Sequence, residues 1–184
     1  PGPSGALRTG FIKANAPVIL VTMADLSDDL TGINDLIKHI KDDVGILSFS
    51  RYCKGGKISL NQPESLYTIK WFKHSLKVKL PRIAGWIINV FTGLGTVDPT
   101  NSFKLYSTSM LRGLDLTSTT SFSVTLEIVM KAFAKGNKIK EFPTTWTDRS
   151  FGESNFPLTR SLFSYFPWLL IMVLKNRFYS FREK

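Results

Sequence analysis

The sequence predicts an α/β fold, and three segments near its start carry that prediction. Residues 18–23 and 44–50 are short, almost wholly apolar runs, which is typical of strands covered on both faces. Between them, residues 31–41 repeat apolar side chains at the period of a helix with one buried face. A strand, a helix and a second strand in this order indicate that the two strands pair in parallel in an α/β sheet.

The elements around this unit follow from the same kinds of pattern. Apolar spacing predicts a helix over residues 4–15 that ends before Pro17. Gly, Pro and Asn in residues 54–65 predict a mobile loop. The remaining elements are expected in this order: helices over 66–79 and 83–94 separated at Pro81, a strand over 103–106, a helical turn over 107–113, a helix over 122–135 closed by Gly136, and a strand over 138–146 whose Pro143 favours an edge position.

The composition indicates one globular domain with a substantial core. The chain has 184 residues, of which 43% are hydrophobic and 21% charged, and this balance excludes an intrinsically disordered chain. Cys53 is the only cysteine, so the chain cannot form a disulfide within itself. Two histidines far apart in sequence, His39 and His74, are too few to complete a structural zinc site with it.

Basic charge is concentrated in the middle of the chain. The net charge is +10, yet residues 1–50 carry four basic and six acidic side chains. Residues 51–86 carry eight basic side chains against Glu64 alone. Such a local excess attracts phosphate groups, whether on lipid head groups, nucleotides or nucleic acid. A solvated basic face without a ligand is the alternative interpretation.

Three polar segments point to a site for phosphate-bearing ligands. The first is the turn after the strand at 18–23, where Asp25 begins an acidic stretch, and a carboxylate at a strand end can hold a divalent cation. The second and third are residues 98–106 and 146–155, which supply donors for phosphate. Together the segments predict a site for a metal-bound diphosphate and a second, anionic substrate.

Several of these residues also have a purely structural interpretation. Asp25 and Asp28 can cap a turn or the start of the next helix, as aspartate often does. Asp98, which precedes Pro99, can simply set a turn. Glu127, on the helix expected over 122–135, is interpreted as a structural hydrogen-bonding residue rather than an acid catalyst.

The C-terminal segment is rich in aromatic and aliphatic side chains. Residues 163–174 are nearly continuously apolar, which is too short a run for a membrane span of about 20 residues. Aromatic residues beside Arg160, Lys175 and Arg177 favour a helix that lies at a bilayer surface. A buried C-terminal helix is the alternative.

The polar segments, in this order, resemble the family 2 glycosyltransferases that use a polyprenyl phosphate acceptor, the dolichol-phosphate mannose synthase type. The resemblance implies a GT-A fold, which is Rossmann-like with a mixed, mainly parallel sheet. It implies a partial catalytic domain over 1–156, and 157–184 is then an amphipathic helix at the membrane surface. The matching residues are 5–10, 23–28, 50–56, 98–106 and 143–154, with Phe122 and Glu127.

The resemblance further implies an activity and a role for each site residue. Family members transfer a hexose from a nucleotide diphosphate sugar to a polyprenyl phosphate, with inversion and with a divalent cation, Mg²⁺ or Mn²⁺. The implied assignments are a metal site at Asp25, Ser27 and Asp28, phosphate contacts from Arg51, Arg82 and Ser154, and catalytic roles for Asp98 and Arg149.

Three departures from the family pattern bear on these expectations. Met23 stands where the family carries a first aspartate, and Asn155 stands where a basic residue is common. The strand, helix and strand that open the family fold have no counterpart, so the chain is expected to be the C-terminal part of a catalytic domain or a truncated relative. A non-catalytic relative that binds lipid phosphate or a partner subunit is therefore the alternative.

The expected partners follow from the same resemblance. They are a nucleotide diphosphate sugar, a polyprenyl phosphate lipid and the cytoplasmic face of a membrane, to which the protein is peripheral or tethered. A homo-oligomer is also expected, because a sheet without its first strands leaves backbone and apolar groups exposed. Nucleic acid is not an expected partner, since no recognisable nucleic-acid motif accompanies the basic charge.

Overall fold

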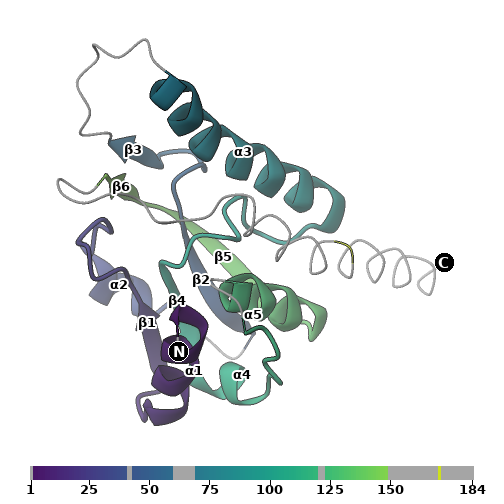
Figure 1. Cartoon of the computed structure of the whole chain (residues 1–184). Coiled ribbons are helices and arrows are strands. Elements are labelled where there is room, and N and C mark those ends of the chain that lie inside the picture. Colours follow the sequence, from purple (N-terminus) through teal and green to yellow (C-terminus); the bar gives the residue numbers. More distant parts are fainter. Residues whose placement is uncertain (1, 41–42, 60–68, 120–122, 149–169, 171–184) are drawn as a thin grey trace.

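The computed structural model describes residues 2–40, 43–59, 69–119, 123–148 and 170. Its elements alternate between helices and strands, in agreement with the predicted class (Figure 1). In chain order they are α1 (Pro3–Lys13), β1 (Val18–Val21), α2 (Ile33–Ile37), β2 (Val44–Ser50), β3 (Lys57–Ser59), α3 (Ile69–Thr92), β4 (Lys104–Ser107), α4 (Thr108–Arg112), α5 (Ser123–Ala134), β5 (Lys138–Pro143) and β6 (Thr145–Thr147).

Four strands form the main sheet in the order β1-β4-β2-β5. β4 is antiparallel to both of its neighbours, whereas β2 and β5 are parallel. Three strands therefore run in one direction and β4 alone runs in the other, which confirms a mixed, mainly parallel sheet. The expected direct pairing of β1 with β2 is wrong, because β4 comes from much later in the chain and lies between them.

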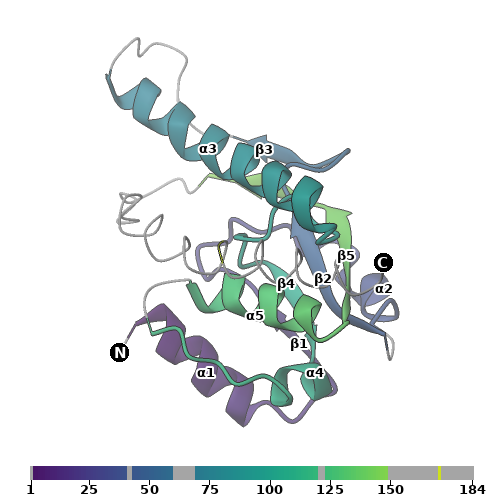
Figure 2. The ribbon, with the colours of Figure 1, turned by 90° about the vertical axis from the view of Figure 1, so that its right-hand side faces the viewer.

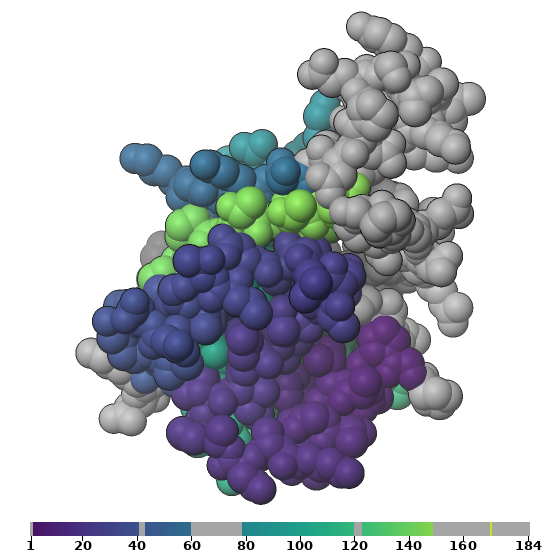
Figure 3. Space-filling view, turned by 90° about the vertical axis from the view of Figure 1, so that its left-hand side faces the viewer, coloured from purple at the N-terminus to yellow at the C-terminus, as the bar shows by residue number. Residues whose placement is uncertain are grey.

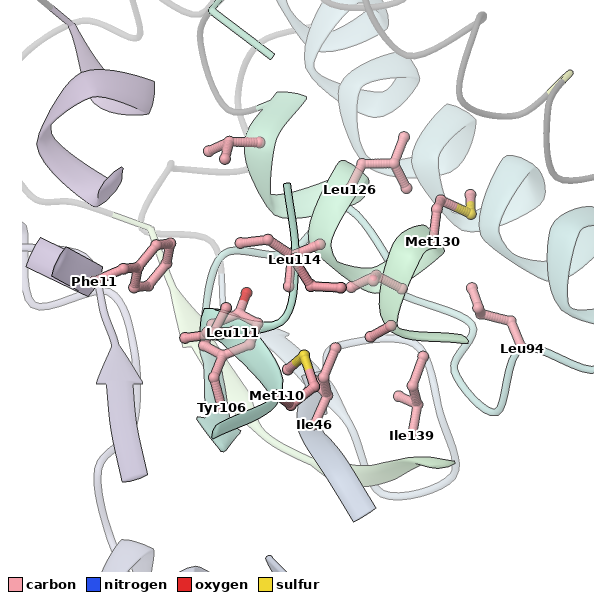
Figure 4. Packing of buried hydrophobic residues seen from close by; sticks show 14 of the residues in the cluster. Phe11, Ile46, Leu94, Tyr106, Met110, Leu111, Leu114, Leu126, Met130 and Ile139 are labelled. Atoms are coloured by element: carbon pink, nitrogen blue, oxygen red, sulfur yellow. The ribbon is translucent and has the colours of Figure 1, made fainter. Parts of the chain in front are cut away.

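Helices cover both faces of this sheet, and side chains alternate between the faces along each strand. Ile46 and Tyr106 face α1, α4 and α5, where Phe11 meets the Tyr106 ring edge to face at a centroid distance of 5.8 Å (Figure 4). Leu47 and Leu105 point to the other face, against the apolar side chains of α2. Burial from both sides explains why every residue of β2 is buried.

Three predicted elements differ from the structure. The strand expected over 138–146 is divided into β5 and β6, which belong to different sheets. The expected break at Pro81 is absent, and α3 continues through it as one helix. Proline removes one helical hydrogen bond, but close packing after it, at Gly85 and Ile88, keeps the second half in place. The expected loop over 54–65 contains β3, which pairs in parallel with β6. Because β3 has only three residues and its partner strand is distant in sequence, no local pattern in the sequence reveals it.

Other local predictions are confirmed. Gly136 follows α5 with a φ of 83°, the left-handed conformation in which glycine ends helices. Pro143 closes β5, which lies at an edge of the four-stranded sheet among the described strands. Glu127 on α5 is fully buried and accepts hydrogen bonds from Thr117, Ser118 and Lys131, so its role is structural.

The predicted C-terminal surface helix lies outside the described residues, with the exception of Leu170, which is exposed. The division of the chain near residue 156 therefore stays a prediction. None of the helices in the described part of the chain combines the length and the apolar character needed to cross a bilayer.

Candidate functional site

The candidate site lies at one edge of the main sheet. Val21 at the end of β1 and Ser48 near the end of β2 both pair with Lys104, the first residue of β4. Because β4 is antiparallel to its neighbours, its start lies where β1 and β2 end. Open α/β sheets bind ligands at this edge, outside the carboxyl ends of the strands.

The acidic turn after β1 has a fixed conformation. Asp28 Oδ2 accepts hydrogen bonds from the Thr22 hydroxyl (3.0 Å) and the Met23 backbone N–H (2.9 Å). Asp25 Oδ1 accepts from the Ser27 backbone N–H (3.2 Å). Leu26, between them, has a φ of 58°, which a leucine adopts only under constraint.

The same turn is attached to β6. The backbone N–H of Thr147 donates to the Ser27 carbonyl oxygen (2.9 Å), and Asp28 forms an isolated antiparallel bridge with Trp146. Figure 3 shows the segment after β1 (blue) directly beside the β5–β6 region (green). The turn is therefore held between the main sheet and the small β3–β6 sheet.

The oxygens of the acidic turn are suitable for a hard divalent cation. Within the described residues, Asp25 Oδ2 and Asp28 Oδ1 have no hydrogen-bond donor, and the buried Ser27 hydroxyl has no partner. Burial raises the pKa of Asp28 despite its two hydrogen bonds, and the charge of Asp25 adds to this effect. A cation bound at the turn would offset the repulsion between the Asp25 and Asp28 carboxylates.

The turn supplies only part of a coordination shell. The described residues include no group of three or more His, Cys, Asp or Glu side chains that could hold a metal ion. Mg²⁺ is commonly held by one or two carboxylates, with substrate phosphates and water completing the shell. The residues present therefore fit a cation that arrives with a diphosphate, not a closed structural metal site.

Arg51, which is partly exposed, and the fully buried Asp98 form a bidentate ion pair beside this turn. Arg51 Nε lies 2.8 Å from Asp98 Oδ2 and Nη2 lies 2.9 Å from Oδ1, and the Arg51 backbone N–H also donates to Oδ2 (3.2 Å). The guanidinium carbon lies 4.9 Å from the centre of the Tyr52 ring. Burial is the largest single effect and lowers the pKa of Arg51, but the charge and hydrogen bonds of Asp98, with the charges of Tyr52 and Asp28, together outweigh it and raise that pKa. Both carboxylate oxygens of Asp98 are thus occupied.

A tight turn places Arg51 at this position. The Ser50 hydroxyl accepts hydrogen bonds from the backbone N–H groups of Tyr52 (3.2 Å) and Cys53 (3.1 Å). Gly55 has a φ of 92°, and a β-carbon on Gly56 would lie 2.6 Å from the Ser50 carbonyl oxygen. The two glycines therefore allow the chain to fold back immediately after β2.

Two ionisable residues of this edge escaped prediction from the sequence. Lys104 is fully buried, and its ammonium donates to the carbonyl oxygens of Asn101 and Asp98. Burial lowers the pKa of Lys104 to about 7, and the nearby charge of Asp98 offsets only part of that effect. The sequence did contain one indication of this residue, because Lys104 stands between apolar residues of a predicted strand.

Glu141 on β5 is the second of these residues. Its Oε1 accepts hydrogen bonds from the Thr96 hydroxyl (2.7 Å) and the Val97 backbone N–H (2.7 Å). The Thr96 hydroxyl in turn accepts from the Asp98 backbone N–H (3.2 Å). The loop that carries Asp98 is therefore held by the hydrogen bonds to Glu141 of the sheet and by the ion pair with Arg51.

The structure brings most of the predicted site residues to one edge of the sheet. Asp28 is within electrostatic range of both Asp25 and Arg51, so the acidic turn and the guanidinium share one side of the sheet. Arg82 is exposed on α3, within electrostatic range of Tyr52. Arg149 and Ser154 lie outside the described residues.

Comparison with known proteins confirms the predicted resemblance. No protein-family model matches the sequence. The chain is 30% identical over 167 residues to the dolichol-phosphate mannosyltransferase of Pyrococcus furiosus, and the match covers 89% of this chain. It covers 43% of that relative, so the chain spans less than half the length of the curated protein it matches.

Solved structures confirm the predicted GT-A fold. Glucosyl-3-phosphoglycerate synthase of Mycobacterium tuberculosis, in complex with Mn²⁺, UDP and glucosyl-3-phosphoglycerate, matches with a TM-score of 0.57 at 10% identity, over 96% of this chain and 55% of the other. The complex of that synthase with Mg²⁺ and UDP matches with a TM-score of 0.57 at 12% identity, over 96% of this chain and 54% of the other. At these identities the likeness concerns the fold alone.

Proposed function

We propose, from the similarity of this chain to the polyprenyl-phosphate type of family 2 glycosyltransferase, that it carries part of a catalytic site for hexose transfer. The donor is a nucleotide diphosphate sugar and the acceptor is a polyprenyl phosphate. The observation that supports this proposal best is the shared edge of the sheet, where Asp28 is within electrostatic range of both Asp25 and Arg51, the partner of Asp98. Such a site offers separate contacts for a cation and for an anion.

The acidic turn is the proposed donor end of the site. Asp25 and Asp28, with the Ser27 hydroxyl, would hold Mg²⁺ or Mn²⁺ together with the donor diphosphate. When bound, the cation supplies Lewis-acid stabilisation of the charge that develops on the departing diphosphate. Met23 contributes only its backbone N–H to the turn, so the site relies on fewer carboxylates than the family pattern.

The basic residues are the proposed acceptor end. A phosphate oxygen of the acceptor forms a bond to the anomeric carbon while the bond from that carbon to the diphosphate breaks, which inverts the anomeric centre. The acceptor is already an anion, so no general base is needed, and positioning and charge screening dominate. Arg51 and Arg82, together with Arg149 and Ser154, are the proposed phosphate contacts.

Asp98 then acts as a positioning residue. Arg51 occupies both of its carboxylate oxygens, and this arrangement leaves Asp98 poorly suited to accept a proton from a substrate. Asp98 instead holds the Arg51 guanidinium in one orientation. Arg51 Nη1 has no acceptor among the described residues, which leaves donors on the partly exposed side of the group for a phosphate.

A transfer assay tests the proposal. The purified protein, in its natural full length, is incubated with a panel of nucleotide diphosphate hexoses, a polyprenyl phosphate and Mn²⁺, and the lipid-linked hexose is measured. We expect transfer that is lost with a chelator and in Asp25→Asn, while Asp35→Asn, an exposed residue of α2 that pairs with Lys38, leaves it unchanged. Lipid phosphate binding without transfer from any donor would support the non-catalytic alternative, which Met23 and the incomplete carboxylate set favour.

A further inference from the structure

Lys104 is a fully buried lysine that the proposed transfer does not use. It is the first residue of β4, where it pairs with Val21 of β1 and Ser48 of β2. Figure 2 shows that α3 and the small β3–β6 sheet gather at this end of the main sheet, whereas α4 lies at the other end. Lysine is almost never fully buried unless it is paired, so the position of Lys104 requires an explanation.

The ammonium of Lys104 holds together the turn that carries Asp98. It donates to the carbonyl oxygens of Asp98 (3.4 Å) and Asn101, the first and last residues of that turn. The Asn101 backbone N–H donates to the Asp98 carbonyl oxygen (3.3 Å), and the Asn101 side-chain amide donates to the Phe49 carbonyl oxygen of β2 (2.7 Å). Lys104 therefore helps to set the position of the residue that orients Arg51.

Charged groups from several segments of the described chain lie within electrostatic range of the Lys104 ammonium. They are Asp98 before β4, Arg51 after β2, Glu141 on β5 and Asp28 in the acidic turn. The three carboxylates favour the protonated lysine, and Arg51 opposes it. Burial is the largest effect and lowers the pKa of Lys104 to about 7, so this residue gains or loses its proton near neutral pH.

The charge of Lys104 decides whether the surroundings of Arg51 are balanced or negative. When Lys104 is protonated, it and Arg51 balance the carboxylates of Asp98 and Glu141. When Lys104 is neutral, one carboxylate of this group is uncompensated, which lowers the attraction of Arg51 for an anion. An anion bound close to Arg51 would in turn favour the protonated lysine, because the coupling between two binding events is reciprocal.

We propose that Lys104 is a positioning residue of the anion site, and that an anion binds at Arg51 together with a proton taken up by Lys104. The proton passes from the solvent to the Lys104 amine. The resulting ammonium forms charge-assisted hydrogen bonds to the Asp98 turn, which are stronger than those of the neutral amine. That the anion is the acceptor phosphate rests on the proposed function, whereas the coupling to a proton belongs to Arg51, Asp98 and Lys104 themselves.

Calorimetric titration with sulfate tests the coupling without substrates. Sulfate resembles phosphate but keeps its charge between about pH 6 and about pH 9, so a change in affinity belongs to the protein. The protein in its natural full length is titrated at constant ionic strength and without divalent cations, which would change the charge of the acidic turn. We expect the affinity to fall about tenfold over this range. Titration in two buffers of different ionisation enthalpy should show an uptake of about half a proton per sulfate at about pH 7.5.

Two substitutions at Lys104 separate this coupling from a purely structural role. Lys104→Met should take up no proton, and its loss of sulfate affinity relative to the unaltered protein should be about tenfold larger at about pH 6 than at about pH 9. A purely structural lysine would weaken binding equally at both pH values. Lys104→Arg keeps its charge at every pH, so its sulfate affinity should not depend on pH.

A matched control removes another group that titrates near neutral pH. His39 lies beside the Phe142 ring, at a centroid distance of 5.2 Å, and His39→Gln should leave the proton uptake unchanged. Near-ultraviolet circular dichroism and thermal melting check that each variant remains folded.

Three results would overturn the proposal. The unaltered protein could bind no sulfate at about pH 6, or it could bind sulfate without any uptake of protons. Neither result needs a variant, so both remain decisive if the substitutions at Lys104 prevent folding. Lys104→Met could also keep the full proton uptake, which would assign the proton to another group. Proton-coupled sulfate binding in a protein that transfers no hexose would contradict only the proposed function.

Discussion

Replacing Lys104 with methionine should flatten the pH dependence of the protein's stability between about pH 7 and pH 9. In the folded protein burial lowers the pKa of Lys104 to about 7, from 10.5 for an unperturbed lysine. Between these two values the unfolded chain binds a proton that the folded protein does not. Raising the pH through this window therefore favours the folded state.

The magnitude follows from the difference in proton binding. One proton corresponds to about 1.4 kcal/mol per pH unit, so this group alone raises the free energy of unfolding by about 2 kcal/mol from pH 7 to pH 9. Lys104→Met removes that slope. It also removes the hydrogen bonds to the Asp98 and Asn101 carbonyl oxygens, which costs about 1–3 kcal/mol at every pH.

Urea unfolding followed by circular dichroism at several pH values measures both effects. Relative to the unaltered protein, the variant should lose about 2 kcal/mol of stability between pH 7 and pH 9, because only the unaltered protein gains stability over that window. Lys79→Met, which changes an exposed lysine on α3, serves as the control and should keep the original slope. Parallel pH profiles for the Lys104 variant and the unaltered protein would refute the assignment of a neutral, buried lysine at this edge.

Two further substitutions test the packing around the site. Gly85→Ala should lower the free energy of unfolding by about 1–3 kcal/mol, since the new methyl group would meet the Val97 carbonyl oxygen; Gly10→Ala in α1, where no atom lies within 4 Å, should leave thermal stability equal or higher. Arg51→Lys cannot maintain the bidentate contact with buried Asp98 and should cost about 3 kcal/mol or more, with equal melting temperatures counting against the pair's importance.

The elements that could be predicted from the sequence are those whose local pattern of hydrophobic residues reflects their burial. β2 is wholly apolar apart from Gly45 and two serines and was located to the residue, because helices cover both of its faces. β3 was missed, since two of its three residues are exposed and the partner strand β6 lies far along the chain. The prediction of two helices around Pro81 failed because packing at Gly85 outweighs the local cost of proline.

The candidate site was predictable as a set of residues but not as a set of contacts. Asp25 was identified from its place after a strand, the family resemblance assigned roles to Asp28, Arg51 and Asp98, and the topology brings these residues to one edge. Their pairing depends on tertiary structure. Arg51 and Asp98 are 47 residues apart, and only the insertion of β4 between β1 and β2 brings the Asp98 loop to the end of β2.

The loop that carries Asp98 connects α3 to the candidate site physically. Its Val97 carbonyl oxygen lies against Gly85 of α3, the Thr96 hydroxyl and the Val97 backbone N–H donate to Glu141 of β5, and Asp98 holds Arg51. The helix, the sheet and the guanidinium therefore all fix the same few residues. A side chain at Gly85 would displace Val97 and with it the adjacent Asp98, so Gly85→Ala should also disturb the ion pair with Arg51, although the substituted residue lies outside the site.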